Sequence, residues 1–388
     1  MFYILLTTFF LILQSLLILS TNINIFPEIF FLSWLTNRGL TPFKDFFDNH
    51  GFLLKYLLSP FTFDKSLSSF KVVYFILQTL NLIFFLLIIR KIKSKLGFFL
   101  GGLTYVLVIF FLSQNDFWFE TVIATFYLLI YLILISKKTK YSSYVLGILA
   151  ALVSFIKPQS GVVILIIFIM TKNFMPLLTF FLTETAAFIF FALKGGLVAL
   201  IDNLFFYNLY LAKYYRPSYF SDGKFIITSL LIVSAAIILV IFNKKLKAIY
   251  PQLFFIILGL LHLVSGYTRI RLVPIATFSI ILVADTFAYI KNKHKIILSV
   301  ILGIYTLIML FKVYQHRVFL NQKRIPYIEV KKNQDFLLNR IPQTYFPVKY
   351  PLTEKYYLNC SNNLFFSFFD KTNPFLNDLK NKFKRCFN

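Results

Sequence analysis

The first twenty residues, MFYILLTTFFLILQSLLILS (1–20), carry no charged side chain and are mostly apolar. An α-helix needs about 20 such residues to cross the hydrocarbon core of a bilayer. The run lacks both the basic start and the small-residue cleavage site of a secretory signal peptide. We therefore expect it to form a retained first membrane-spanning helix.

The composition of the whole chain extends this expectation. Of the 388 residues, 59% are hydrophobic and only 14% are charged, whereas a soluble domain carries about 25% charged residues. The formal net charge is +25, but the lysines come in short clusters between apolar runs. This pattern is typical of loops beside anionic membrane lipid. The composition predicts a polytopic membrane protein and argues against a nucleic-acid partner.

The apolar runs predict an all-α transmembrane bundle of about 11 spans. The two runs that meet at Lys157-Pro158 are short, so they are compatible with half-spans or a broken pair as well as with two crossings. A membrane domain over 1–313, with a long outer loop at 21–67, precedes a small polar extracytoplasmic region at 314–388. The expected spans are 1–20, 68–90, 96–113, 119–136, 143–157, 160–171, 174–194, 225–242, 249–266, 270–290 and 296–313.

The charges between the spans predict which side each loop occupies. Four breaks are rich in lysine and contain no acid, which is the pattern of cytoplasmic loops: RKIKSK (90–95), KKTK (137–140), NKKLK (243–247) and KNKHK (291–295). The alternation of spans then places most carboxylates of the membrane domain on the outer face. These are Glu28, Asp45, Asp48, Asp64, Asp116, Glu120, Asp202 and Asp222.

The first outer loop concentrates ionisable residues. An apolar stretch too short to span, IFPEIFFLSWL (25–35), is expected to lie along the membrane surface as a helix. It is followed by RGLTPFKDFFDNHGFLLKYLLSPF (38–61), which contains Asp45, Asp48 and His50. Taken alone, these residues are either polar groups that cap the next helix or members of a site.

The stretch at 38–61 resembles the first outer loop of the polytopic GT-C glycosyltransferases. Within that class it is similar to protein O-mannosyltransferases, aminoarabinose transferases and the galacturonosyltransferases of lipopolysaccharide cores. The matching residues are Gly39, Pro42-Phe43-Lys44-Asp45 and His50-Gly51, with Phe52 where a proline often stands. QNDFWFE (114–120), SFIKPQSG (154–161) and GYTRIRLVPIATF (266–278) resemble later parts of the family pattern, so the likeness covers residues 1–290.

The resemblance implies a function. Such enzymes transfer a sugar from a polyprenyl-phosphate donor to an envelope glycan, lipid or protein at the outer face of a bacterial-type plasma membrane. It implies Asp45 as the general base, with Asp48 beside it as a second catalytic carboxylate. The residues expected to bind substrate are His50, Asp116, Glu120, Lys157, Gln159, Arg269 and Arg271. No metal ligands are assigned, and a divalent cation stays possible because members differ in metal use.

Structural interpretations compete with several of these roles. Asp116 and Glu120 also fit interfacial polar residues beside Trp118, and Lys157 also fits a lysine that snorkels to the interface. Arg269 and Arg271 straddle one residue, so we expect only one of them to reach a site. Glu184 lies near the middle of an apolar run and has no counterpart in the family pattern. Cys360 and Cys386 are expected to be unpaired thiols, with a disulfide between them as the alternative.

Two other functions use similar substrates. A flippase or transporter for lipid-linked sugars should distribute charges through its spans and show internal repeats, whereas the charges here gather at one face. An envelope polymerase or ligase would rely on a large late outer loop. The chain contains no nucleotide-binding, zinc or nucleophile-elbow motif. The residues therefore favour a lipid-linked-sugar glycosyltransferase.

Overall fold

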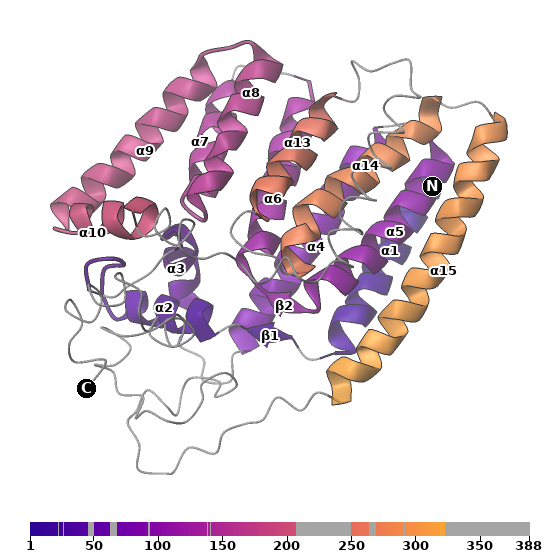
Figure 1. Cartoon of the computed structure of the whole chain (residues 1–388), viewed down its shortest axis with the longest axis horizontal. Coiled ribbons are helices and arrows are strands. Elements are labelled where there is room, and N and C mark those ends of the chain that lie inside the picture. The colour runs from indigo at the N-terminus through magenta and orange to yellow at the C-terminus, as the bar shows by residue number, and fades with distance from the viewer. Residues whose placement is uncertain are drawn as a thin grey trace, which may run out of the picture. The chain divides into compact units, whose positions relative to one another are not determined.

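In the computed structural model, the described residues form helices, the turns between them and two very short strands (Figure 1). The chain divides into two compact units, which we call the bundle unit and the loop unit and describe separately. The bundle unit comprises Met1–Ile25, Lys71–Glu184 and Arg216–Lys323, and the loop unit comprises Phe26–Phe70, Thr185–Tyr215 and Arg324–Asn388. The residues that the structure describes are 1–21, 23–25, 27–45, 50–62, 68–91, 94–137, 139, 141–206, 250–263, 269–289 and 292–322.

The bundle unit is built from long apolar helices and shorter ones that end inside it. Its helices are α1 (Phe2–Leu19), α4 (Ser68–Arg90, from Lys71 on), α5 (Lys95–Ser113), α6 (Phe119–Leu134), α7 (Ser142–Ser154), α8 (Val163–Thr171), α9 (Met175–Leu193, up to Glu184), α13 (Tyr250–Leu261), α14 (Val273–Tyr289) and α15 (Asn292–Gln322). One 3-10 turn, Pro158–Val162, leads into α8, and another, Arg269–Leu272, leads into α14. The strands β1 (Asn24–Ile25) and β2 (Asp116–Phe117) pair in parallel.

Six helical segments are long and apolar enough to cross a membrane: Phe2–Leu19, Ser68–Arg90, Lys95–Ser113, Met175–Leu193, Arg269–Phe287 and Lys295–Gln315. Four further apolar helices are shorter, Phe119–Leu134, Ser142–Ser154, Pro158–Thr171 and Pro251–Leu261. The described residues thus show a multi-helix membrane protein with fewer full-length spans than the 11 expected. The span predicted at 225–242 and most of the region predicted at 314–388, with Cys360 and Cys386, lie outside the described residues.

Helix α5 lies at the centre of the bundle, beside α1, α14 and α15 (Figure 1). Glycines on α5 bring the neighbouring backbones close, because a Cβ at Gly97 would lie 2.6 Å from the carbonyl oxygen of Ala284 on α14. A Cβ at Gly102 would overlap the ring of Phe10 on α1. Small residues at such contacts are the usual means of close helix packing in membranes. The outer faces of α1 and α15 carry exposed apolar side chains, such as Leu16 and Leu307, which suits contact with lipid.

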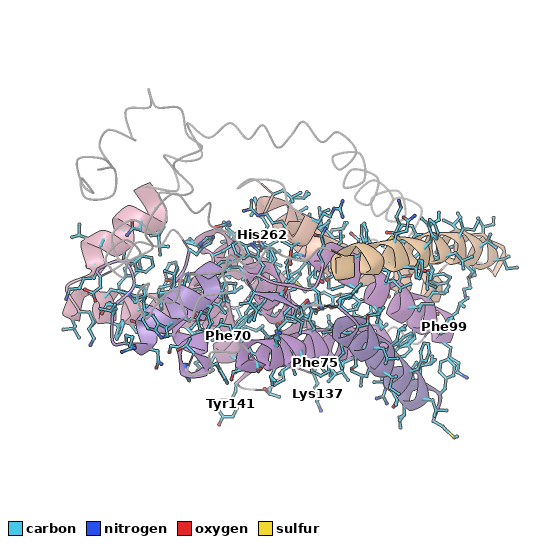
Figure 2. All side chains as sticks on the ribbon, turned by 90° about the horizontal axis from the view of Figure 1, so that it is seen from below. Phe70, Phe75, Phe99, Lys137, Tyr141 and His262 are labelled. Atoms are coloured by element: carbon cyan, nitrogen blue, oxygen red, sulfur yellow. The ribbon has the colours of Figure 1, made fainter. Side chains whose placement is uncertain are left out.

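The two ends of the bundle unit differ chemically. At one end, Lys91 Nζ donates a 2.6 Å hydrogen bond to Ser136 Oγ, which joins the turn after α4 to the end of α6. The start of α1 lies at the same end, because Arg90 lies over the ring of Tyr3 and Lys95 over the ring of Phe2. We call this the lysine end. Lys137 and Tyr141, in the turn between α6 and α7, point outward in Figure 2.

The opposite end of the bundle unit holds β1 and β2. Here Asn115 Nδ2 donates hydrogen bonds to the carbonyl oxygen of Ile18 (3.0 Å) and to Thr21 Oγ1 (2.9 Å), which ties the turn after α5 to the end of α1. Arg90, Lys91, Lys95 and Lys137 thus share one end, while Asp116 and Glu120 lie at the other. This is the separation expected from the sequence, and which end faces the cytoplasm stays a prediction.

The loop unit contains most of the long loop predicted at 21–67. Its elements are α2 (Pro27–Asn37), α3 (Leu53–Leu58), a 3-10 turn (Ser59–Phe61), α10 (Leu197–Ile201) and a π-helical turn (Asp202–Phe206), together with the end of α9. The short apolar stretch predicted to be helical forms a helix from Pro27 on, and its Phe30 and Leu35 are buried. A small core forms around Phe43, Phe191 and Leu200.

Candidate functional site

Several helix ends meet at the end of the bundle unit opposite the lysine end. Asn173 Nδ2, just after α8, donates a 2.9 Å hydrogen bond to Ser143 Oγ at the start of α7, so α7 and α8 run antiparallel. The turn between them therefore lies at the far end, where α6 begins, α13 ends and α14 begins. This arrangement collects ionisable side chains from segments that are distant in the sequence. We call Glu120, Lys157, Arg271, His262, Tyr127 and Ser160 the charged cluster.

Glu120 is the centre of the charged cluster. It lies in the first turn of α6 and has no exposed surface. Lys157 Nζ donates a hydrogen bond to Glu120 Oε1, and Arg271 Nε lies 3.7 Å from the same oxygen. A carboxylate in the first turn of a helix is also favoured by the helix dipole. One carboxylate oxygen thus faces two cations.

The position of Lys157 follows from the proline that comes after it. The residue before a proline is driven out of the helical region, and Lys157 has φ −145° and ψ 120°. Helix α7 therefore stops at Ser154, and the chain turns back through Pro158–Val162. Gly161 lets this turn approach α7, because a Cβ there would lie 2.8 Å from the Cβ of Ser154. Two short helices thus meet at this turn, and the number of membrane crossings here stays a prediction.

His262 joins the charged cluster through Tyr127 and Ser160. It follows the end of α13 and is fully buried. Its Nε2 lies 3.1 Å from Tyr127 Oη and 3.5 Å from Ser160 Oγ, and it interacts electrostatically with Lys157 and Glu120. His262 thus contacts both α6, through Tyr127, and the turn that leads into α8, through Ser160.

The charged cluster holds two cations beside one carboxylate. Lys157 and Glu120 are buried, and the Arg271 side chain is 15% exposed. Among the described residues, Glu120 Oε2 accepts no hydrogen bond although it is buried. Buried ionisable groups are costly and usually functional in membrane-spanning segments. Two cations held together at one end of the bundle are suited to an anionic ligand.

The structure separates the two arginines, as expected from their spacing. Arg271 belongs to the charged cluster, whereas the guanidinium of Arg269 lies over the ring of Phe111, 5.3 Å from its centroid. Gln159 is half-buried in the turn that follows Lys157. Asp116 is half-buried in β2, where it pairs with Asn24 through the backbone. The structure thus brings together Glu120, Lys157 and Arg271 of the residues predicted from the sequence.

The remaining predicted residues belong to the loop unit. Asp45 is half-buried, and its Oδ2 accepts a 2.7 Å hydrogen bond from the backbone N–H of Thr41. Burial, and then the charge of Asp45, raise the pKa of the Tyr56 phenol. His50 is half-buried just before α3, and Asp48 lies outside the described residues. One oxygen of Asp45 thus supports the local turn.

Three buried ionisable residues were not singled out from the sequence. His262 belongs to the charged cluster, and Lys55 in α3 of the loop unit is buried, with Nζ donating a 2.8 Å hydrogen bond to the carbonyl oxygen of Gly51. Asp285 is buried near the end of α14 and accepts a 3.2 Å hydrogen bond from Gln252 Nε2. The signal that could have found His262 and Asp285 is an ionisable residue inside an apolar run.

The part of the chain that the structure describes has no group of three or more His, Cys, Asp and Glu side chains arranged to hold a metal ion. Comparison of the chain with protein-family models, with characterised proteins and with solved structures gives no match. The functional argument therefore rests on the residues and on the geometry of the charged cluster.

Proposed function

We propose that this chain is a membrane glycosyltransferase of GT-C type that takes its sugar from a polyprenyl-phosphate donor at the outer face of the membrane. The observation that carries the proposal is the cluster of Lys157, Arg271 and Glu120, which places two cations together at one end of the bundle. A lipid-linked phosphate can reach such a position while its hydrocarbon tail stays in the bilayer. The composition and the apolar helices support the membrane setting.

The cations supply what the leaving group requires. When the sugar is transferred, the bond between its anomeric carbon and the phosphate oxygen breaks, and the electron pair stays on the phosphate. Arg271 offers a guanidinium fork suited to phosphate, and Lys157 offers a compact point charge. Both lie in an apolar surrounding, where they stabilise developing negative charge more strongly than in water. This is electrostatic stabilisation of the leaving phosphate.

The acceptor must lose a proton during the same step. In this proposal a carboxylate accepts that proton as the new bond to the anomeric carbon forms. The family resemblance assigns this role to Asp45, whose Oδ2 accepts a hydrogen bond from the Thr41 amide. Asp48 and His50 accompany it. Envelope glycan, lipid and protein are the acceptor classes considered.

One observation favours a second candidate function, a flippase or transporter of lipid-linked sugars. Asp285 is buried within α14 and Glu184 lies within α9, where it accepts a hydrogen bond from Ser154 Oγ. Ionisable residues inside spans are typical of transport pathways. The two cations of the charged cluster suit a phosphate in either function, so the assay has to distinguish the two functions.

The test uses purified protein in lipid nanodiscs with a radiolabelled prenyl-phosphate sugar and no added nucleotide. We expect transfer of the label to an envelope extract, and a loss of about 100-fold or more in the Lys157→Met variant. Lys137→Met, at the exposed lysine end, is the matched control and should keep normal activity. Transfer only from a nucleotide sugar would contradict the proposal. Movement of the donor between leaflets without transfer would favour the flippase.

A further inference from the structure

One backbone angle in the loop unit is unusual. Phe43 has a φ of +70°, in the left-handed region, and its ring is buried. A bulky residue rarely adopts this conformation, because its Cβ then approaches a neighbouring carbonyl oxygen. We propose that packing against Phe191 holds Phe43 at this angle and thereby orients the carboxylate of Asp45, which makes both phenylalanines positioning residues for the general base. This inference rests on the proposed function.

The turn that contains Phe43 is closed by two hydrogen bonds between the same pair of residues. The backbone N–H of Asp45 donates a 3.0 Å hydrogen bond to the carbonyl oxygen of Thr41. In return, the backbone N–H of Thr41 donates a 2.7 Å hydrogen bond to Asp45 Oδ2. Phe43 is the central residue of these five, so its φ angle decides whether the two ends of the turn meet. The direction of the Asp45 carboxylate therefore depends on the backbone of Phe43.

The packing of the loop unit holds Phe43 in this conformation. Its ring meets the ring of Phe191 edge to face, with the centroids 5.5 Å apart, and Leu200 belongs to the same core. Phe191 has no exposed surface and also contacts the ring of Phe52, with the centroids 4.8 Å apart. An unfavourable backbone angle persists only where the surrounding structure fixes it, and such angles cluster at functional sites.

The end of α9 keeps Phe191 beside the turn. The backbone N–H of Gly196 donates a 2.8 Å hydrogen bond to the carbonyl oxygen of Phe191, and Gly195, with a φ of +70°, reverses the chain there. This is a Schellman helix end. A Cβ at Gly196 would lie 3.3 Å from the Cβ of Lys44, so the helix end lies directly against the turn. A shift of this helix end would therefore move the turn.

A purely structural role for Phe43 predicts a different response to substitution. Phe43→Gly and Phe43→Ala both remove the ring. If the ring only fills the core, glycine should be the worse replacement, because it loses more conformational freedom on folding. If the ring holds a left-handed backbone angle, glycine should be the better replacement, because it adopts a positive φ without a steric cost. The two variants thus distinguish a positioning role from a packing role.

The first experiment measures transfer from the lipid-linked donor in nanodiscs. We expect the kcat of Phe43→Gly to stay within about threefold of the wild type. The kcat of Phe43→Ala should be about tenfold lower than that of Phe43→Gly, because a residue with a Cβ disfavours the left-handed angle. The KM for the donor should not change in either variant, because Lys157 and Arg271 lie outside this turn.

Hydrogen exchange of the segment 40–45 gives a second measurement, which needs no activity. In the wild type and in Phe43→Gly, the amides of Thr41 and Asp45 should exchange slowly, because both donate the hydrogen bonds that close the turn. In Phe43→Ala the same amides should exchange at least about tenfold faster.

Phe191→Ala tests the packing step. It removes the ring that holds Phe43, so kcat should fall about tenfold and the exchange of the segment 40–45 should become faster. Adding Phe43→Gly to Phe191→Ala should restore kcat to the value of Phe43→Gly alone, because glycine keeps the turn without the packing. If Phe191→Ala does not fold, the comparison of Phe43→Gly with Phe43→Ala tests the inference by itself.

Phe30 of α2 is the matched control within the loop unit. It is also buried, and its ring packs against the ring of Phe70 with the centroids 5.2 Å apart, but its backbone is helical. Thermal unfolding should therefore show Phe30→Gly to be less stable than Phe30→Ala, because glycine is unfavourable inside a helix. At Phe43 the order of the two replacements should be the opposite.

The outcomes separate the inference from the proposed function. If Phe43→Gly loses as much activity as Phe43→Ala while the wild type transfers sugar, Phe43 is a core residue only and the inference alone is overturned. Loss of slow exchange in Phe43→Ala without a fall in kcat would overturn it too, since the turn would then not matter for catalysis. If the wild type transfers no sugar, the proposed function is contradicted, and the order of exchange rates decides whether the packing still orients Asp45.

Discussion

Lys157 donates a hydrogen bond to Glu120 inside the bundle unit, although Lys157 lies in the turn after α7 and Glu120 lies in the first turn of α6. The contact exists because α6 begins where the turn between α7 and α8 lies. Arg271 approaches the same carboxylate oxygen from the start of α14. Glu120 thus connects three separate segments of the chain and holds two cations beside each other.

The first prediction concerns the stability of this ion pair. Lys157→Met leaves the buried carboxylate of Glu120 without its closest cation, and removing one partner of a buried pair costs about 3–5 kcal/mol. The double variant Lys157→Met, Glu120→Gln also removes the charge of Glu120. It should therefore regain part of the lost stability. Thermal unfolding in detergent measures the stability of the single variant and of the double variant. Equal losses in the single and double variants would show that the pair does not contribute to stability.

The second prediction separates the two arginines. Arg271→Met should weaken the binding of a prenyl-phosphate probe by about tenfold or more, because its guanidinium belongs to the charged cluster. Arg269→Met is the matched control, since Arg269 lies over Phe111, and it should change binding by less than about threefold. Titration calorimetry measures the affinity of each variant for the probe. A larger effect at Arg269 would mean that the ligand binds elsewhere.

The helices could be predicted from the sequence more completely than the site. Apolar runs and lysine-rich breaks indicate which segments are helical, since both follow from the cost of placing charges in lipid. The proline after Lys157 also marks the turn between α7 and α8. The pairing of Lys157 with Glu120 could not be deduced, because it depends on which helix ends meet. His262 went unnoticed because a lone histidine in an apolar run has no spacing pattern.

The third prediction tests the packing of the bundle. Gly97→Ala should destabilise the protein by about 1–3 kcal/mol, because the added methyl group would overlap the Ala284 carbonyl and force α5 away from α14. Gly303→Ala on α15 is the control, since a Cβ there meets no atom within 4 Å. Chemical denaturation measures the difference. If the two variants lose the same stability, the close contact between α5 and α14 is absent.

The fourth prediction concerns the sidedness of the membrane domain. In a background with both native cysteines replaced by Ser, a cysteine at exposed Asn37 of the loop unit should react with an impermeant maleimide in intact cells. A cysteine at exposed Tyr141, at the lysine end, should react only after permeabilisation, because lysine-rich loops stay in the cytoplasm. Labelling of Tyr141→Cys in intact cells would reverse the proposed orientation.

The central claim is that the charged cluster binds the phosphate of a prenyl-linked sugar. The most direct measurement is an electron cryomicroscopy structure of the protein with a non-cleavable prenyl-phosphonate sugar. We predict density for the phosphonate within hydrogen-bond distance of Lys157 Nζ and the Arg271 guanidinium. Ligand density elsewhere, with Lys157 still bonded to Glu120 and no ligand beside Arg271, would contradict the account.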